Sequence, residues 1–202
     1  YEEAGAQGLI AGANAALAGS GGGPLVLDRA DAYIGVLIDD LVTLGTREPY
    51  RMFTSRAEYR LHLRADNADQ RLTTIGSNYG LVSSKRQATY EAKKSALDAA
   101  IKLAKTRSAT PSELKKKGFL INQDGVRRTA LDLLAYPKIT VSMLSNLWPE
   151  FGILEGDIVE QLEIKGMYAG YMGRQESDMR SFRNDESLKL PTSLDYTTIG
   201  GL

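Results

Sequence analysis

The stretch Ser83–Arg107, SSKRQATYEAKKSALDAAIKLAKTR, decides the fold class. It is rich in strong helix formers, and it begins with serine, a good N-cap residue. Its apolar side chains recur at helical spacing, at Tyr90, Leu97, Ile101 and Ala104. The pattern predicts a long amphipathic helix that turns one face toward a hydrophobic core.

Helical patterns continue on both sides of this segment. Directly after it, Thr110, Pro111 and Glu113 have the spacing of a capping box with proline at the first helical position, which predicts a new helix. The other stretches with helical patterns are 1–18, 31–45, 66–80, 129–136, 140–147 and 155–183. Glycines weaken the last of these by ~1 kcal/mol each, so that it could consist of two pieces. The fold class is therefore mainly α.

A small β element is expected within this helical chain. The hexapeptide YRLHLR, Tyr59–Arg64, alternates strictly between apolar and basic side chains. Alternation with a period of two is typical of a half-buried strand. It would place Arg60, His62 and Arg64 together on one exposed face.

Composition limits the classes of function. Of the 202 residues, 43% are hydrophobic and 25% are charged, as in an ordinary globular protein. The chain has no cysteine and a single histidine, so disulfides and thiolate metal sites are excluded and no metal site is expected. No apolar run approaches the ~18 residues of a membrane span. Because the formal net charge is zero, any affinity for nucleic acid must come from locally clustered charges.

The chain divides into three regions. We expect residues 1–24 to form a terminal helix and a glycine-rich linker, residues 25–82 an arginine-rich connector, and residues 83–202 a carboxy-terminal helical domain. The first helix is rich in alanine and glycine, which suits close packing against another backbone, and its core partner is expected to lie outside this chain. The opening, YEEAGAQG, lacks a methionine and is already helical, as in a piece of a longer protein.

The connector contains an unusual concentration of arginine. The stretch EPYRMFTSRAEYRLHLR, residues 48–64, holds four arginines and no lysine: Arg51, Arg56, Arg60 and Arg64. Guanidinium groups bind phosphate oxygens in a bidentate manner and stack on exposed bases, which favours nucleic-acid recognition. In the alternative interpretation, neighbouring acids pair with these arginines on a solvated surface: Glu48, Glu58, Asp66 and Asp69. Both interpretations stay open at this point.

No catalytic residue is expected. Asp39 and Asp40 are adjacent on a predicted helix, so their side chains point about 100° apart and are expected to serve in capping or ion pairs. His62 is expected to be a surface residue or a phosphate contact rather than a general base. The SGGG run lacks the lysine of a P-loop, and G-x-G-x-x-G is absent.

Four motifs together resemble one known family. They are YEEAGAQGLIAGANAA (1–16), AYIGVLIDDLVTLGTREPYRMFTSRAEYRLHLRADNADQRLTTIG (32–76), YAGYMGRQ (168–175) and LPTSLDYTTIGGL (190–202). They are similar to the glucose-inhibited division protein A family, the flavin subunit of the tRNA uridine-5-carboxymethylaminomethyl modification enzyme, whose mitochondrial members are called the tRNA translation optimisation protein. The resemblance covers essentially the whole chain.

The resemblance implies a carboxy-terminal fragment truncated from an FAD-binding Rossmann-type protein. Such proteins are homodimers that use FAD and NADH and act with a tRNA-modifying GTPase. With methylenetetrahydrofolate as one-carbon donor, the complex installs a carboxymethyl- or taurinomethyl-type aminomethyl group on C5 of the wobble uridine. The fragment, without a flavin domain, is expected to be inactive alone and to bind tRNA and the GTPase partner. The alternative is a structural helical protein-interaction domain without direct tRNA contact.

The family's functional residues are carried over by motif. Arg51 and Arg60 match arginines that the family uses for tRNA binding. Arg56 and Arg64 lie in the same motif and are expected to join them in binding tRNA. Glu3 and Gln7 match positions close to the flavin. The stretch PLVLDRADAYIGVLIDDL, residues 24–41, resembles the organelle branch more than the bacterial one, so the expected compartment is the mitochondrial matrix, with bacterial cytoplasm as the alternative.

Overall fold

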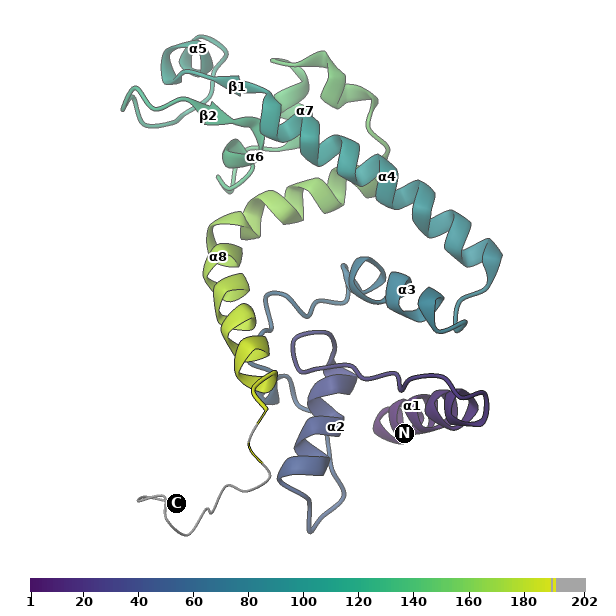
Figure 1. The fold of residues 1–202 in the computed structure, drawn as a ribbon. Helices are drawn as coiled ribbons and strands as arrows, with labels where there is room; N and C mark the ends of the chain where they lie inside the picture. The colour runs from purple at the N-terminus through teal and green to yellow at the C-terminus, as the bar shows by residue number, and fades with distance from the viewer. Residues whose placement is uncertain (190, 192–202) are drawn as a thin grey trace, which may run out of the picture.

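The chain is mainly helical, with one antiparallel two-stranded sheet among the residues that the structure describes (Figure 1). The computed structural model describes residues 1–189 and 191, so the motif at 190–202 lies outside the described residues apart from Pro191. The elements are α1 (Glu2–Gly19), α2 (Tyr33–Thr43), η1 (Thr54–Arg56), α3 (Ala68–Asn78), α4 (Ser84–Thr106), β1 (Ser108–Ala109), α5 (Pro111–Lys116), β2 (Arg128–Thr129), α6 (Ala130–Leu133), α7 (Val141–Ser145), η2 (Pro149–Ile153) and α8 (Gly156–Glu186). The predicted fold class is confirmed.

Local capping explains where several helices begin. The Ser83 hydroxyl accepts a hydrogen bond from the backbone N–H of Arg86 at the start of α4. At the start of α5, Thr110 and Glu113 cap each other's backbone N–H groups, as the capping box predicts. These bonds satisfy amide groups that have no partner within the helix. The predicted helix starts at Ser83 and Thr110 are confirmed.

The larger hydrophobic core lies in the upper part of Figure 1, where α4 to α7, η2 and the first part of α8 meet. We call it the carboxy-terminal core. Its largest fully buried side chains are Leu114, Leu133, Leu144, Phe151, Leu162 and Val141. The sheet closes one end of this core, because Ser108 pairs with Thr129 and Ala109 pairs with Arg128. The apolar face of α4 supplies Leu97, Ala100 and Ala104 to it.

A second, smaller cluster lies in the amino-terminal half of the chain. It contains Val36, Ala57 and Leu63, with Tyr33, Met52 and Tyr59 packed against them. We call it the amino-terminal cluster. It joins α2 to the residues on either side of η1, and therefore holds the arginine-rich stretch against α2.

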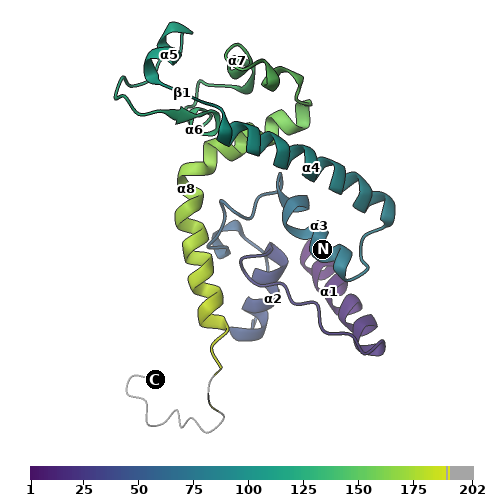
Figure 2. The same cartoon turned by 45° about the horizontal axis from the view of Figure 1, so that its top comes forward.

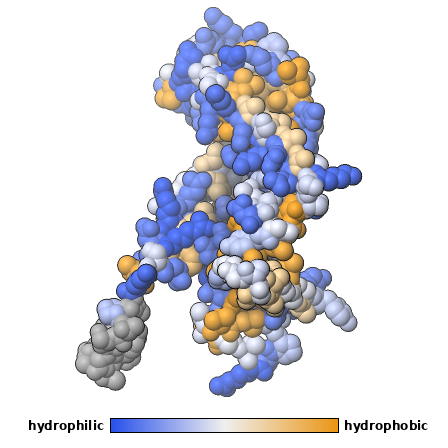
Figure 3. Space-filling view, turned by 45° about the vertical axis from the view of Figure 1, so that its right-hand side comes forward, coloured by the Kyte–Doolittle hydropathy of each residue, from blue (hydrophilic) through white to orange (hydrophobic). Residues whose placement is uncertain are grey.

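Helix α1 contributes nothing to either core. None of its residues is buried, and Leu9 is 58% exposed. The Asn14 side chain fixes the following loop, accepting from the N–H of Leu25 at 2.7 Å and donating to the Leu25 carbonyl at 3.0 Å. Figure 3 shows hydrophobic atoms on the lower half of the face it presents, the half that contains α1. A core partner outside this chain stays a prediction.

Helix α8 is a single element of 31 residues rather than two pieces. It curves in both views, so that its first part lies beneath α4 and its last part runs down toward α2 (Figures 1 and 2). Near its end, Arg183 lies 2.7 Å from carboxylate oxygens of Asp28 and of Asp31. Phe182 also meets Tyr59, with ring centroids 6.2 Å apart. The helix thereby joins the carboxy-terminal core to the amino-terminal region.

The strand predicted at residues 59–64 is wrong. The backbone there forms turns, in which the N–H groups of His62 and Leu63 both donate to the carbonyl of Tyr59, at 2.9 Å and 2.8 Å. Tyr59 and Leu63 are four residues apart, and this spacing brings both to the amino-terminal cluster. The backbone groups that a strand would offer to a neighbour are thus used locally. The small β element lies instead at β1 and β2.

None of the described helices is long and apolar enough to cross a membrane.

Two glycines of α8 should respond oppositely to alanine. A Cβ at Gly166 would overlap the Leu134 side chain, whereas a Cβ at Gly170 would meet nothing within 4 Å. Gly166→Ala should therefore lower the free energy of unfolding by about 1 to 3 kcal/mol through overpacking. Gly170→Ala, the control, should raise it by about 1 kcal/mol through helix propensity. Urea unfolding measures both, and equal effects would contradict the close packing of α8 on α6.

Candidate nucleic-acid interface

The arginine-rich stretch crosses the surface between α2 and α3. Helix α2 ends before Gly45, whose φ of +66° is easily adopted by glycine. The chain then returns along α2, forms η1, and enters the turns at Tyr59–Leu63. We call residues 48–64 the arginine segment. Its conformation is set mainly by side chains rather than by a backbone ladder.

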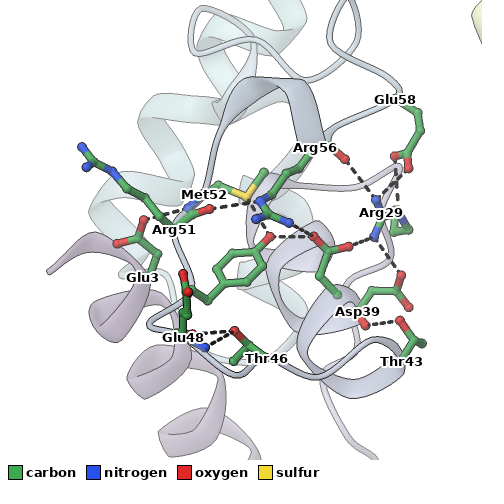
Figure 4. Close-up of polar contacts among 12 residues, drawn as sticks. Glu3, Arg29, Asp39, Thr43, Thr46, Glu48, Arg51, Met52, Arg56 and Glu58 are labelled. Carbon is green, nitrogen blue, oxygen red and sulfur yellow. Dashed lines mark hydrogen bonds and ion pairs between the residues drawn. The ribbon is translucent and has the colours of Figure 1, made fainter.

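Arg29 and Asp40 hold this arrangement together, and Figure 4 shows Arg29 with its partners Asp39 and Glu58. Nη1 of Arg29 donates to Oδ1 of Asp40 at 2.6 Å and to Oδ2 of Asp39 at 2.9 Å. Nη2 of Arg29 donates to Oε1 of Glu58 at 2.7 Å and to the carbonyl of Arg56 at 3.1 Å. The side chains of Arg29 and Asp40 are only 14% and 7% exposed. One guanidinium thus ties α2 to the C-terminal end of η1 and to the residue two positions beyond it.

Tyr50 and Arg56 complete the surroundings of Asp40. The Tyr50 hydroxyl donates to Oδ2 of Asp40 at 2.7 Å, and Nη1 of Arg56 lies 3.6 Å from the same oxygen. The Arg56 guanidinium also lies over the Tyr50 ring, 4.6 Å from its centroid. Burial raises the pKa of Asp40, but the hydrogen bonds from Arg29 and Tyr50 outweigh it and the pKa is lowered. Burial and the bond to Asp40 raise the pKa of Tyr50 to about 12. At neutral pH the carboxylate is therefore charged and the phenol is neutral.

Two further bonds fix the backbone around Arg51. Oε1 of Glu3 accepts from the N–H of Met52 at 2.9 Å, which links α1 to the arginine segment. Nε of Arg56 donates to the carbonyl of Arg51 at 3.1 Å. With its backbone held on both sides, Arg51 points its guanidinium away from the network (Figure 4). Gln7, the other residue matched to flavin neighbours, is exposed on α1.

The four arginines fall into two pairs. Arg51 and Arg60 are exposed, and no carboxylate of the described residues lies within 4.0 Å of either guanidinium. The Arg51 guanidinium lies beside Phe53, 5.7 Å from the ring centroid, and this ring is 51% exposed. Arg56 and Arg64 are instead held inside the protein's own network. Two guanidinium groups and an aromatic face are thus presented to solvent.

The ion-pair interpretation applies to only part of the segment. Arg64 pairs with Asp66 at 2.9 Å and covers the Tyr168 ring at 4.6 Å. Glu58 is taken by Arg29, and Asp69 by Lys93 at 2.7 Å. Among the described residues, three of the four predicted acidic partners, Glu58, Asp66 and Asp69, therefore pair with cations other than Arg51 and Arg60, and the fourth, Glu48, lies within 4.0 Å of neither guanidinium.

His62 does not share an exposed face with Arg60, as the predicted strand required. It is half-buried, and burial, together with Arg71, Arg183 and Arg64, lowers the pKa of its imidazole. A neutral, partly enclosed histidine does not contribute positive charge to the surface. The exposed face shared with Arg60 and Arg64 is therefore absent, because the chain turns instead of extending there, and a phosphate contact by His62 stays a prediction.

Sequence reasoning predicted ion pairs for Asp39 and Asp40, and the structure confirms both. It missed Arg29 and Tyr50. The partners of Asp40 lie ten and eleven positions away, in the segments before and after α2, so no contact within one helix or strand brings them together. Among the described residues there is no group of three His, Asp or Glu side chains that could hold a metal ion.

Comparisons with known proteins define the class of this chain. Residues 84–176 match the family described as the tRNA modifying enzyme MnmG/GidA C-terminal helical domain. Over 202 residues the chain is 48% identical to the tRNA uridine 5-carboxymethylaminomethyl modification enzyme MnmG of Granulibacter bethesdensis, and over 205 residues it is 47% identical to that of Geobacter sulfurreducens. It is also similar to the solved structure of Aquifex aeolicus GidA in its form II crystal, with a TM-score of 0.79 and 33% identity.

The helical architecture and these matches define the class of the chain, a helical domain similar to the carboxy-terminal part of tRNA modification enzymes. More particularly, it belongs to the MnmG/GidA family. The match to the Granulibacter relative and the match to the Aquifex structure each cover all of the chain, but the chain spans only 32% of either protein. The predicted family is confirmed.

The Asp40 network generates a pH-dependent prediction. Asp40→Asn should lower the free energy of unfolding by about 2 kcal/mol at pH 7, because a buried guanidinium loses a charged acceptor. The pKa of Asp40 is lower in the folded state than in the unfolded state, where it is about 4. The contribution of Asp40 to the free energy of unfolding is therefore complete above this unfolded-state pKa and is lost as the pH falls through the folded-state pKa. The difference between wild type and variant should therefore shrink below pH about 4, as measured by urea unfolding.

Asp39→Asn is the matched control for this experiment. Asp39 contacts the same guanidinium, but its side chain is 39% exposed, so the loss should be less than half as large. An equal loss for the two variants would show that Asp40 has no special place in the network.

Proposed function

We propose that this chain is the tRNA- and partner-binding portion of an FAD-dependent enzyme that modifies C5 of the wobble uridine. The observation that carries the proposal is the exposure of Arg51 and Arg60 on a segment whose conformation is fixed by the contacts of Arg29, Asp40 and Glu3. Because the backbone beside Arg51 is already held, less conformational entropy is lost when its exposed side chain binds a phosphate. The printed names of the relatives supply the class of substrate, a tRNA uridine.

Within this proposal the three regions have separate roles. Residues 1–24 belong to the edge of a flavin domain, residues 25–82 carry the arginine segment, and residues 83–202 form the helical domain that contacts the GTPase partner. The full-length protein is a homodimer that uses FAD, NADH and methylenetetrahydrofolate. The relatives' greater length leaves room for such a domain, since this chain spans only about a third of it.

The described residues do not form a flavin site by themselves. Glu3 lines a cleft of about 410 Å³ together with Arg51 and Met52, and its carboxylate is engaged by the backbone of Met52. Gln7 does not line this cleft. We therefore assign the flavin to the rest of the full-length protein, and the chain alone should be inactive.

A structural protein-interaction domain is the second candidate. The engagement of Arg56 and Arg64 by the protein's own groups favours it, since these two arginines stabilise the fold. Stabilisation of the fold does not explain Arg51 and Arg60, which are exposed and have no ion-pair partner among the described residues. As for compartment, the named relatives are bacterial, which favours the bacterial alternative over the mitochondrial matrix.

Titration of tRNA binding with salt tests the proposal. Arg51→Ala and Arg60→Ala should each weaken tRNA binding and reduce the slope of log K against log salt concentration by about 1, because each removes a phosphate contact. Fluorescence anisotropy with labelled tRNA at several salt concentrations measures both quantities.

Arg107→Ala is the control, because Arg107 is paired with Glu150 at the far end of α4. Its slope should stay at the wild-type value. If all three variants keep the wild-type slope, or if no tRNA binds at low salt, the protein-interaction candidate is favoured instead.

A further inference from the structure

A cavity of about 460 Å³ lies between α3, α4, α8 and the turn that contains His62. Its volume falls within the range typical of small-molecule sites, about 300 to 1,000 Å³. It shares no lining residue with the cleft beside α1 or with the Arg29 and Asp40 network. Its lining combines cations, side-chain amides and aromatic rings.

The charges around the cavity are mostly positive. Arg64, Arg71, Lys105 and Lys165 line it, against a single carboxylate, that of Glu176. Arg64 and Arg71 hold local backbone carbonyls in place. Lys105 and Lys165 are exposed, and no carboxylate of the described residues lies within 4.0 Å of either amino group. The rim therefore offers two free ammonium groups to an anion.

A pair of amides supplies hydrogen-bonding capacity in the same cavity. Nε2 of Gln70 donates to Oε1 of Gln161 at 2.6 Å, which joins α3 to α8. Each amide has more donors and acceptors than this one bond uses, and neither side chain contains a buried atom without a partner. The side-chain carbonyl of Gln70 and the amide nitrogen of Gln161 thus have no hydrogen-bond partner among the described residues and are not fully buried, and both residues line the cavity. An acceptor beside a donor is complementary to the edge of a nucleobase.

Two rings flank these amides. The Tyr168 ring lies against the Arg64 guanidinium at 4.6 Å, so the ring is held by a cation on one side. The half-buried imidazole of His62 also lines the cavity. Aromatic and guanidinium planes are the groups on which unstacked bases are bound in single-stranded RNA.

We propose that this cavity binds one unstacked ribonucleotide, with its base at Tyr168 and the Gln70–Gln161 pair and its phosphate at Lys105 and Lys165. A site for phosphate alone would not need the amide pair or the aromatic ring. A purely apolar ligand would leave the amides and ammonium groups without partners. If the proposed function holds, this nucleotide is a residue of bound RNA. Only the source of the nucleotide rests on the proposed function.

Titration with uridine 5′-monophosphate tests the site directly. In NMR spectra of the 202-residue chain, backbone amide signals of α3, α4 and α8 that border the cavity should shift, and inorganic phosphate should produce smaller shifts at the same concentration. Equal shifts with phosphate would reduce the cavity to an anion site and overturn the proposal, as would shifts confined to other parts of the chain.

Variants separate the three kinds of contact. Gln161→Leu should weaken nucleotide binding about fivefold through the lost hydrogen bonds, and Tyr168→Leu about tenfold through lost stacking. Tyr168→Phe should retain the wild-type affinity, because the ring is kept. Lys105→Gln should weaken binding, while Lys102→Gln, three residues earlier on α4 and outside the lining, should not. If Gln161→Leu and Tyr168→Leu keep the wild-type unfolding midpoint and also bind the nucleotide with unchanged affinity, the proposal is overturned.

The source of the nucleotide is distinguished by a second arm. A single-stranded oligonucleotide with one 5-iodouridine should crosslink on irradiation to Tyr168 or His62, identified by mass spectrometry, and bind more tightly than the free nucleotide if RNA is the source. Equal affinities would assign the site to a free nucleotide instead, and crosslinks at other residues would contradict it. The double variant Arg51→Ala and Arg60→Ala should lose tRNA binding but keep the free-nucleotide shifts, so failure of one proposal is distinguishable from failure of the other.

Discussion

The geometry of the arginine segment depends on one buried carboxylate, that of Asp40. A charge withdrawn from water must be paired and hydrogen-bonded, or folding is opposed by several kcal/mol. Arg29, Tyr50 and Arg56 all meet this requirement by approaching from different directions. Satisfying one anion therefore fixes residues on both sides of η1, and the segment needs no sheet or helix of its own to keep its shape.

The same requirement distributes positive charge over the surface. Some cations of this neutral chain form ion pairs with its acids, and others stay free. Proximity in sequence does not decide which cations are paired. Arg64 pairs with Asp66, while Arg60, four residues earlier, stays exposed. Residues 84–118 show the imbalance on a larger scale, with ten lysines and arginines against three acids. A net charge of zero thus conceals strongly basic local surfaces, which is the quantity that matters for contact with phosphates.

Features determined by neighbours in sequence could be predicted, and features determined by distant partners could not. The caps at Ser83 and Thr110 and the amphipathic face of α4 depend on residues within a few positions, and all were found. The alternation at Tyr59–Arg64 is also local, but a strand needs a partner strand, which no local pattern reveals. The hydrogen bond of Asp40 with Arg29 spans a loop. Arg51 and Arg60 were singled out only by family resemblance, because their freedom from acids is a property of the folded surface.

The continuity of α8 has a mechanical consequence. A helix resists bending and twisting through its ladder of backbone hydrogen bonds, so a rotation at one end is carried to the other with little loss. Its first turns are embedded beside Leu134 at Gly166, and its last turns are attached to Asp28 and Asp31 through Arg183. Displacement of the helical domain would therefore act on the loop that carries Arg29, because that loop is attached to the last turns of α8 through Asp28 and Asp31.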